Sequence, residues 1–143
     1  FNPKNSMVVS SIIKRVVEGE NPLIVWGDGT AIRDFIFSKD VAEGMLKVVK
    51  KNIQTPINLG SGKGYSIKTL VKTICNSKHI KNKIKIIFDK SKPSGDKIRI
   101  LDVRKAKKYK VYSVTNFSKA IDETIEWYKK NKKISKLRYN FFK

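Results

Sequence analysis

Short apolar runs of strand length alternate along this chain with amphipathic stripes of helical period. The runs include Leu23–Trp26, Ile57–Leu59 and Ile84–Phe88, and each is too short to form a helix. Between them, apolar residues recur at offsets of three and four positions, which is the spacing of one buried helix face. Strands that alternate with helices in this way predict an α/β fold.

Four helices are expected from these stripes. Each begins at or beside a residue whose side chain can accept a hydrogen bond from a free amide group, namely Ser6, Ser38, Ser66 or Thr115. The residues expected to face the core are Val8, Val9, Ile12, Ile13, Val16 and Val17 in the first helix, Val41, Met45, Val48 and Val49 in the second, Ile67, Leu70, Val71, Ile74 and Cys75 in the third, and Phe117, Ala120, Ile121, Ile125 and Tyr128 in the last.

Two further segments, Phe35–Phe37 and Ile98–Leu101, are expected to be extended. Gly27-Asp28-Gly29 predicts a turn, and residues 92–95 predict a loop. The glycine-rich stretch GSGKG at 60–64 fits neither phosphate-binding template, because a P-loop needs Ser or Thr after its Lys and a dinucleotide turn needs a different glycine spacing. We therefore interpret it as a turn that leads to the helix after Ser66.

Positive charge dominates the composition of the 143 residues. Lys and Arg number 32 against 12 Asp and Glu, which gives a formal net charge of +20. A nucleic-acid-binding protein is one explanation, because a phosphate backbone attracts such a chain. The other explanation is a lysine-rich surface, which is favoured because the lysines are scattered and only five residues are Arg, the side chain that base-reading proteins prefer.

Several classes of protein are excluded or disfavoured by the same sequence. No apolar run approaches the roughly 20 residues that a membrane-spanning helix needs. The single cysteine, Cys75, cannot form an internal disulfide, and the absence of a His and Cys cluster argues against structural zinc. A cytoplasmic location is expected. The opening FNPKNS has neither an initiator Met nor a signal-peptide core, so we expect a piece of a longer protein.

Arg33 and Trp26 are the first candidates for a binding site. Arg33 lies between a turn and an apolar segment, where a charged group needs a partner. That partner is either the adjacent Asp34 or a phosphate gripped by two parallel hydrogen bonds. Trp26 either packs in the core or lies beside a base or sugar. His79 is interpreted as a surface residue and Cys75 as part of the helix packing.

Four stretches, in order, resemble the C-terminal part of the NAD(P)-dependent sugar-nucleotide epimerases and dehydratases, which are extended short-chain dehydrogenases. The stretches are GDGTAIRDFIFSKDVAEGML, INLGSGKGYSIKTLVKTI, FDKSKPSGDKIRILDVRKA and ETIEWYKKN. The resemblance covers residues 1–131, leaves 132–143 as a basic tail, and is strongest to the GDP-L-fucose synthases. It implies a substrate-binding lobe with edge elements of a doubly wound, Rossmann-type domain whose N-terminal half is absent here.

The resemblance also implies a function and a set of site residues. A full-length member transfers hydride between NADP or NAD, bound mainly by the N-terminal half, and a nucleoside-diphosphate keto-sugar. Full-length relatives are often homodimers. The residues that the resemblance implies for substrate binding are Arg15, Trp26, Arg33, Lys85 and Arg99, with Arg33 and Arg99 neutralising the diphosphate.

Two departures from the family pattern bear on activity. Met7 stands where the fucose synthases carry an acid His, and a thioether cannot transfer protons. This puts epimerisation in doubt and favours a 4-keto reductase or another sugar-nucleotide enzyme. The family's catalytic Tyr-x-x-x-Lys pair is also missing, because the pair formed by Tyr128 and Lys132 lies too near the C-terminus. We expect this segment alone to be inactive. A non-catalytic nucleotide-sugar-binding module and a basic nucleic-acid-binding domain are the alternatives.

Overall fold

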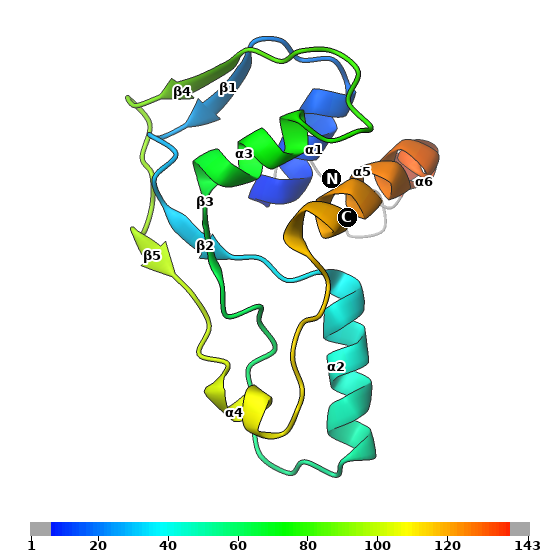
Figure 1. The fold of residues 1–143 in the computed structure, drawn as a ribbon. Coiled ribbons are helices and arrows are strands. Elements are labelled where there is room, and N and C mark those ends of the chain that lie inside the picture. The colour runs from blue at the N-terminus through cyan, green and yellow to red at the C-terminus, as the bar shows by residue number, and fades with distance from the viewer. Residues whose placement is uncertain (1–6, 138–143) are drawn as a thin grey trace.

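The computed structural model of the chain describes residues 7–137, and its helices and strands confirm the α/β class (Figure 1). In chain order the elements are α1 (Val8–Val17), β1 (Leu23–Trp26), β2 (Ile32–Asp34), α2 (Ser38–Lys50), β3 (Gly64–Ser66), α3 (Ile67–Cys75), β4 (Ile86–Asp89), β5 (Ile98–Arg99), α4 (Arg104–Lys108), α5 (Phe117–Lys130) and α6 (Lys132–Leu137).

The strands form two small sheets. In the first, β1 pairs with β4 in parallel, with Trp26 opposite Asp89. In the second, β2 lies between β3, which is antiparallel to it, and β5, which is parallel to it. Arg33 of β2 is opposite Arg99 of β5. Because directly opposite residues of a sheet point to the same face, the fold places two arginines from distant segments side by side.

The hydrophobic core lies where α1, α3 and α5 pack together against β1. Figure 1 shows these three helices gathered on one side of the β1–β4 sheet. The buried residues of the cluster are Ile12, Ile13, Val16, Leu23, Val25, Leu70, Val71, Ile74, Cys75, Ile121, Ile125 and Tyr128. This confirms the stripes predicted for the first, third and last helices. Burial raises the pKa of the Cys75 thiol, which agrees with a packing role.

The helix starts agree with the predicted caps in part. The Ser66 hydroxyl accepts a hydrogen bond from the Thr69 amide at 3.0 Å, as predicted for α3. The predicted cap Thr115 is wrong, because the Asn116 side chain accepts from the amide of Ser118 instead. Thr115 is engaged elsewhere, as described below. The predicted cap Ser6 lies outside the described residues.

The prediction for the inner face of α2 is confirmed in part, because Val41 and Val48 are half-buried but Met45 and Val49 are not. Met45 and Val49 are 59% and 77% exposed, and the residues of this helix that are buried are Asp40 and Gly44. Gly44 explains this orientation, because a Cβ atom there would lie 3.1 Å from the Leu59 side chain. The glycine side of α2 can therefore approach the rest of the chain closely, and the side that carries Met45 and Val49 points away.

Two predicted extended segments also differ from the structure. Neither Phe35–Phe37 nor Ile57–Leu59 forms a strand. The strand at the first position lies three residues earlier, at Ile32–Asp34, because β3 and β5 hydrogen-bond there. Leu59 contributes through its side chain, which lies against Gly44. Apolar composition therefore identified segments whose side chains pack against the rest of the chain, but these segments do not pair with a neighbouring strand.

Tyr128 gives the chain a predictable response to alkaline pH. Its buried hydroxyl donates a hydrogen bond to Glu18 at 3.3 Å, and burial together with Glu18 raises the pKa of Tyr128 to about 12. The folded state holds the phenol proton more tightly than the unfolded state, so this stabilisation is complete below about pH 10 and is lost as the pH rises toward 12. We expect Tyr128→Phe to flatten the fall in melting temperature over this range.

The control for this measurement is Tyr112→Phe, which changes an exposed ring. The melting temperature of this control should fall between pH 10 and pH 12 as steeply as that of the unaltered chain. If the melting temperature of Tyr128→Phe fell as steeply as that of the unaltered chain, the Tyr128 phenol would not be a cause of the fall.

Candidate functional site

Residues 92–97 form a loop that borders three of the five predicted site residues. The Lys92 ammonium lies 5.9 Å from the centre of the Trp26 ring. Arg33 donates to the Asp96 carbonyl oxygen at 2.7 Å, and Arg99 forms an ion pair with the Asp96 carboxylate. Trp26, Arg33 and Arg99 therefore surround one loop.

The Gly27-Asp28-Gly29 turn holds this loop in place. Gly27 has a positive φ of 81°, and a Cβ atom there would lie 2.6 Å from the Ser94 hydroxyl oxygen. The Asp28 amide donates to the same hydroxyl at 3.3 Å. Because Gly27 has no side chain, the turn lies directly against the loop, with Trp26 just before it and Arg33 shortly after it.

Arg33 carries a positive charge that no carboxylate in residues 7–137 neutralises. Its Nη1 donates to the carbonyl oxygens of Ile32 and Asp96, both at 2.7 Å. The adjacent Asp34 carboxylate is engaged elsewhere, so the interpretation of Arg33 and Asp34 as an ion pair is wrong. Neighbouring residues of a strand point to opposite faces, which separates the two side chains. The guanidinium of Arg33 is therefore available to an anionic ligand.

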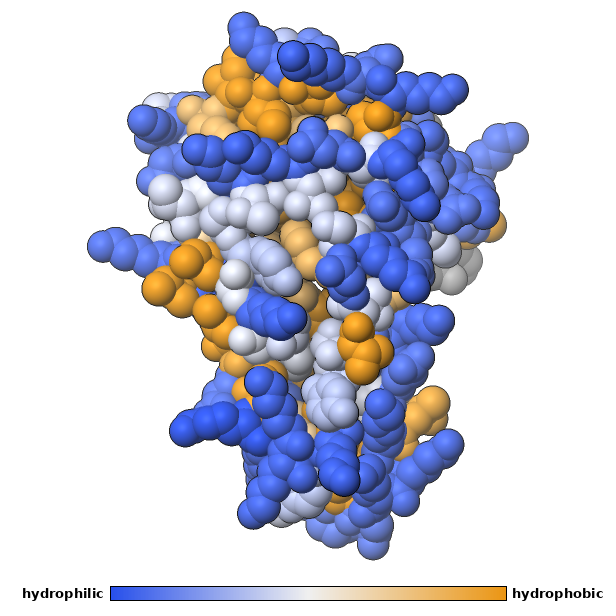
Figure 2. Space-filling view, viewed as in Figure 1, coloured by the Kyte–Doolittle hydropathy of each residue, from blue (hydrophilic) through white to orange (hydrophobic). Residues whose placement is uncertain are grey.

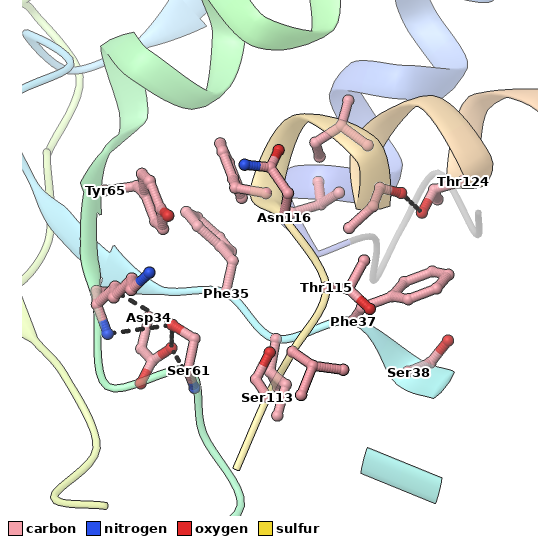
Figure 3. A pocket seen from close by; sticks show the side chains of 17 residues that line it. Asp34, Phe35, Phe37, Ser38, Ser61, Tyr65, Ser113, Thr115, Asn116 and Thr124 are labelled. Carbon is pink, nitrogen blue, oxygen red and sulfur yellow. Dashed lines mark hydrogen bonds between the residues drawn. The ribbon is translucent and has the colours of Figure 1, made fainter. Parts of the chain in front are cut away.

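Asp34 binds the glycine-rich loop on the other face of β2. Its carboxylate accepts hydrogen bonds from the amides of Ser61 and Gly62, both at 3.0 Å, and from the Ser61 hydroxyl (Figure 3). Gly62 has a φ of 65°, and a Cβ atom there would lie 2.4 Å from Val103. The loop amides thus bind an anion of the chain itself, which confirms the interpretation of GSGKG as a structural turn.

Arg15 and Lys85 lie at the β1–β4 sheet, away from the Lys92–Lys97 loop. Arg15 pairs with Glu20 and donates to the Ile24 carbonyl oxygen at 2.6 Å. The hydrogen bond with Glu20 raises the pKa of Arg15 and lowers that of Glu20. Lys85 is exposed just before β4, where its carbonyl oxygen accepts from the Leu23 amide at 2.8 Å. Lys85 is thus about 13 Å along the sheet from Trp26.

Trp26 belongs to an exposed apolar surface and is not in the core. It is 66% exposed, and Ile24 and Ile87 on the same sheet are also exposed. Figure 2 shows hydrophobic side chains gathered over β1 and β4 at the top of the molecule, with hydrophilic side chains beside them. The exposed ring is available for stacking on a ligand.

A cavity of about 620 Å³ lies at the end of β2, where Asp34, Phe35 and Tyr65 are among the residues that line it (Figure 3). The Tyr65 and Phe117 rings stack in its wall with centroids 4.0 Å apart, and Phe35 lies 5.9 Å from Phe117. None of the five predicted site residues lines it. Sequence analysis missed this cavity because its lining comes from the segments around β2, β3 and α5, and no local pattern joins them.

Asp40 ties the start of α2 to the segment before α5. It is buried and accepts hydrogen bonds from the Thr115 amide at 3.1 Å, the Thr115 hydroxyl at 2.7 Å and the Ser113 hydroxyl. Burial by itself raises the pKa of Asp40, but these hydrogen bonds outweigh burial and leave the pKa below its usual value. Asp40 is therefore an anchored carboxylate with a structural role.

The described residues contain neither a helix that could span a membrane nor a cluster of side chains that could bind a metal ion. Within residues 7–137 no helix is both long and apolar enough to cross a bilayer. The same part of the chain contains no group of three or more side chains that could hold a metal ion.

Comparison with known proteins places the chain in a family. Residues 1–60 match the model of the NAD dependent epimerase/dehydratase family. GDP-L-colitose synthase of Yersinia pseudotuberculosis is 32% identical over 108 residues, which are 71% of this chain and 34% of that protein. The chain belongs to the NAD-dependent epimerase/dehydratase family. GDP-L-fucose synthase of Escherichia coli is 28% identical over 145 residues, which cover 92% of this chain and 44% of that enzyme.

Solved structures of this epimerase/dehydratase type agree with the fold. A GDP-L-fucose synthetase from Naegleria fowleri superposes on 93% of this chain with a TM-score of 0.81 and 24% identity, and the match covers 42% of that structure. UDP-glucose 4-epimerase from Thermotoga maritima gives a TM-score of 0.72 over 88% of this chain at 23% identity, and covers 40% of its structure. The chain thus spans less than half the length of the relatives it matches.

The epimerase/dehydratase match includes the candidate site. The segment matched by the family model contains Arg15, Trp26 and Arg33. Lys85 and Arg99 lie beyond that segment, in the part of the chain that the longer pairwise match covers. Met7 is 78% exposed.

Proposed function

We propose that the chain is the substrate-binding part of an NAD(P)-dependent sugar-nucleotide epimerase or reductase of the GDP-L-fucose synthase type. The observation that carries this proposal is the pairing of Arg33 with Arg99 on neighbouring strands at Asp96, in a loop whose other end, at Lys92, lies over the exposed ring of Trp26. Guanidinium groups bind phosphate oxygens with two parallel hydrogen bonds, so two of them suit a diphosphate. Relatives named for their action on GDP-sugars support the ligand class.

In this proposal each site residue has a distinct task. Arg33 binds the diphosphate through the charge that no carboxylate neutralises, and Arg99 exchanges its exposed partner Asp96 for the ligand. Trp26 stacks on the base or sugar, an arrangement in which its large apolar face is covered. Arg15 and Lys85 contact the end of the ligand that lies along the β1–β4 sheet.

The cofactor is proposed to bind outside this part of the enzyme. A neighbouring structure is described as bound to NADP, and NADP or NAD supplies hydride in reactions of this class. The residues 7–137 do not fit a dinucleotide, because Asp34 occupies the amides of the only glycine-rich loop among them. We therefore assign cofactor binding and hydride transfer to the part of the relatives that lies beyond the match, and expect the chain alone to be inactive.

Several further properties belong to the same proposal. The substrate-binding unit is proposed to span residues 1–131, and the sequence from 132 to 143, whose first six residues form α6, is proposed to be a basic tail. Met7 cannot transfer a proton, which favours a reductase that does not need an acid at that position. The full-length enzyme is proposed to be a cytoplasmic homodimer.

Arg33→Ala tests the ligand class. We expect the chain to bind GDP or UDP, and the variant to bind at least about tenfold more weakly, because a hydrogen bond to a charged group contributes on the order of 1.5–3 kcal/mol. Isothermal titration calorimetry with both nucleotides measures this loss. Arg104→Ala is the matched control, since Arg104 lies on α4 and pairs with Asp102.

The alternatives give different results in the same titrations. A nucleic-acid-binding domain would bind unrelated DNA with an affinity that falls steeply with salt, and would be indifferent to GDP and UDP. A chain that binds neither nucleotide, or an Arg33→Ala variant that binds as well as the unaltered chain, would refute the proposal. A stand-alone binding module would bind nucleotide but lack activity when joined to a cofactor-binding part.

A further inference from the structure

Asp96 contacts both arginines of the candidate site. Its carbonyl oxygen accepts a hydrogen bond from Arg33 at 2.7 Å, and its carboxylate forms an ion pair with Arg99. Within residues 7–137 it is the only acidic side chain that pairs with either arginine. A carboxylate on a guanidinium occupies donors that would otherwise bind a phosphate oxygen. The chain therefore carries its own anion at the place proposed for the diphosphate.

The two arginines are not occupied in the same way. Arg33 makes both of its hydrogen bonds through Nη1, so its Nε and Nη2 have no partner among residues 7–137. Arg99 instead donates through Nη2 to the carboxylate of Asp96. One phosphate group can therefore bind at Arg33 while Asp96 stays in place. A second phosphate group at Arg99 must displace the carboxylate or lie against its negative charge, and like charges in contact are unfavourable.

The 92–97 loop, which carries this carboxylate, is held over the site by surface contacts. All of its residues are exposed, and none belongs to the hydrophobic core. The Ser94 hydroxyl donates to the Asp28 carboxylate at 3.3 Å, and a Cβ atom on Gly95 would lie 3.3 Å from Nη2 of Arg33. The loop thus lies directly on this arginine. Segments with few buried contacts open at low free energy, so a ligand can move the loop without disturbing the core.

We propose that Asp96 is a specificity-determining residue, which occupies the second phosphate position of the site until a ligand with two phosphate groups displaces it. This inference rests on the proposed function. Pairing of β2 with β5 brings two like charges side by side, and Asp96 compensates one of them in the free chain. The same carboxylate weakens the binding of a second phosphate group. A monophosphate, which needs only Arg33, is not affected by this competition.

Asp96→Asn tests the assignment through the binding of GDP and GMP. The amide keeps the shape of the side chain and removes its charge. We expect the Kd of GDP to fall at least about threefold, because an exposed ion pair contributes up to about fivefold and the repulsion of the second phosphate is lost with it. The Kd of GMP should change by less than about twofold at about 0.15 M ionic strength, where distant charges are screened. Isothermal titration calorimetry measures both constants, whose ratio should rise.

Two further variants separate the position of the charge from its sign and from the net charge of the chain. Asp96→Glu keeps a carboxylate and should keep the ratio of the two Kd values that the unaltered chain shows. Glu126→Gln removes a carboxylate that pairs with Lys130 on α5. It makes the same change in net charge outside the site, and should also leave the ratio unchanged.

Each result decides the inference. An unchanged ratio in Asp96→Asn, with GDP still bound, would overturn the role of Asp96 and leave the proposed function standing. A rise in the ratio that Glu126→Gln shares would also overturn it, because net charge would then be the cause. If neither the unaltered chain nor Asp96→Asn binds GDP or UDP, the proposed function fails and the role of Asp96 fails with it.

Discussion

Leu70→Ala is expected to lower the free energy of unfolding by about 2–5 kcal/mol, because the truncated side chain leaves a cavity that its neighbours cannot fill completely. Leu70 is fully buried where α3 packs on α1 and α5. Those helices surround it from distant parts of the sequence, so relaxation at one of them cannot close the space. Urea unfolding followed by circular dichroism measures the change.

Leu46→Ala is the matched control for this prediction. Leu46 is on α2 and is 60% exposed, so the same truncation should change stability by no more than about 0.5 kcal/mol. Similar losses for the two variants would mean that the α1–α3–α5 core is not where the stability of the chain resides.

Asp34→Ala is expected to lower the free energy of unfolding by about 2–3 kcal/mol, because hydrogen bonds to a charged group are strong and their amide donors are left without an acceptor. The carboxylate accepts from the amides of Ser61 and Gly62 and from the Ser61 hydroxyl. The loop between Gly60 and Gly64 should lose its fixed position. Chemical unfolding measures the energy, and the amide chemical shifts of Ser61 and Gly62 report the loop.

Asp28→Ala is the control, since Asp28 accepts hydrogen bonds mainly from Thr30 in its own exposed turn. It should cost less than Asp34→Ala and leave the shifts of Ser61 and Gly62 unchanged. If Asp34→Ala left those shifts in place, the carboxylate would not be what holds the glycine-rich loop.

Helices α1, α3 and α5 were predictable because their signals are local. Ile12 and Ile13, for example, belong to a stripe whose period alone indicates a buried face, and the Ser66 hydroxyl caps α3 from within the same turn. The second helix was predicted with the right start, at Ser38, but with Met45 and Val49 facing inward. Periodicity identifies a face that packs, but it does not say whether the packing partner is present.

The candidate site was predictable only as a set of residues. Resemblance to the family selected Arg33, Arg99 and Trp26, but their juxtaposition depends on the pairing of β2 with β5 and on the loop around Asp96. The sequence also could not show that Arg33 lacks an ion pair with its neighbour. The structure shows this, because the carboxylate of Asp34 faces the other side of the strand. Sequence proximity therefore suggested an ion pair that the alternation of a strand excludes.

By itself the sequence determined the α/β class, three of the packed helices and the family, since each depends on patterns within short windows of the chain. Tertiary structure alone decided which anion fills the GSGKG loop, which arginine keeps an unneutralised charge and which face of α2 stays open. These outcomes depend on contacts between segments such as β2 and residues 60–62, or β2 and residues 95–99. A window of local sequence contains only one side of each such contact.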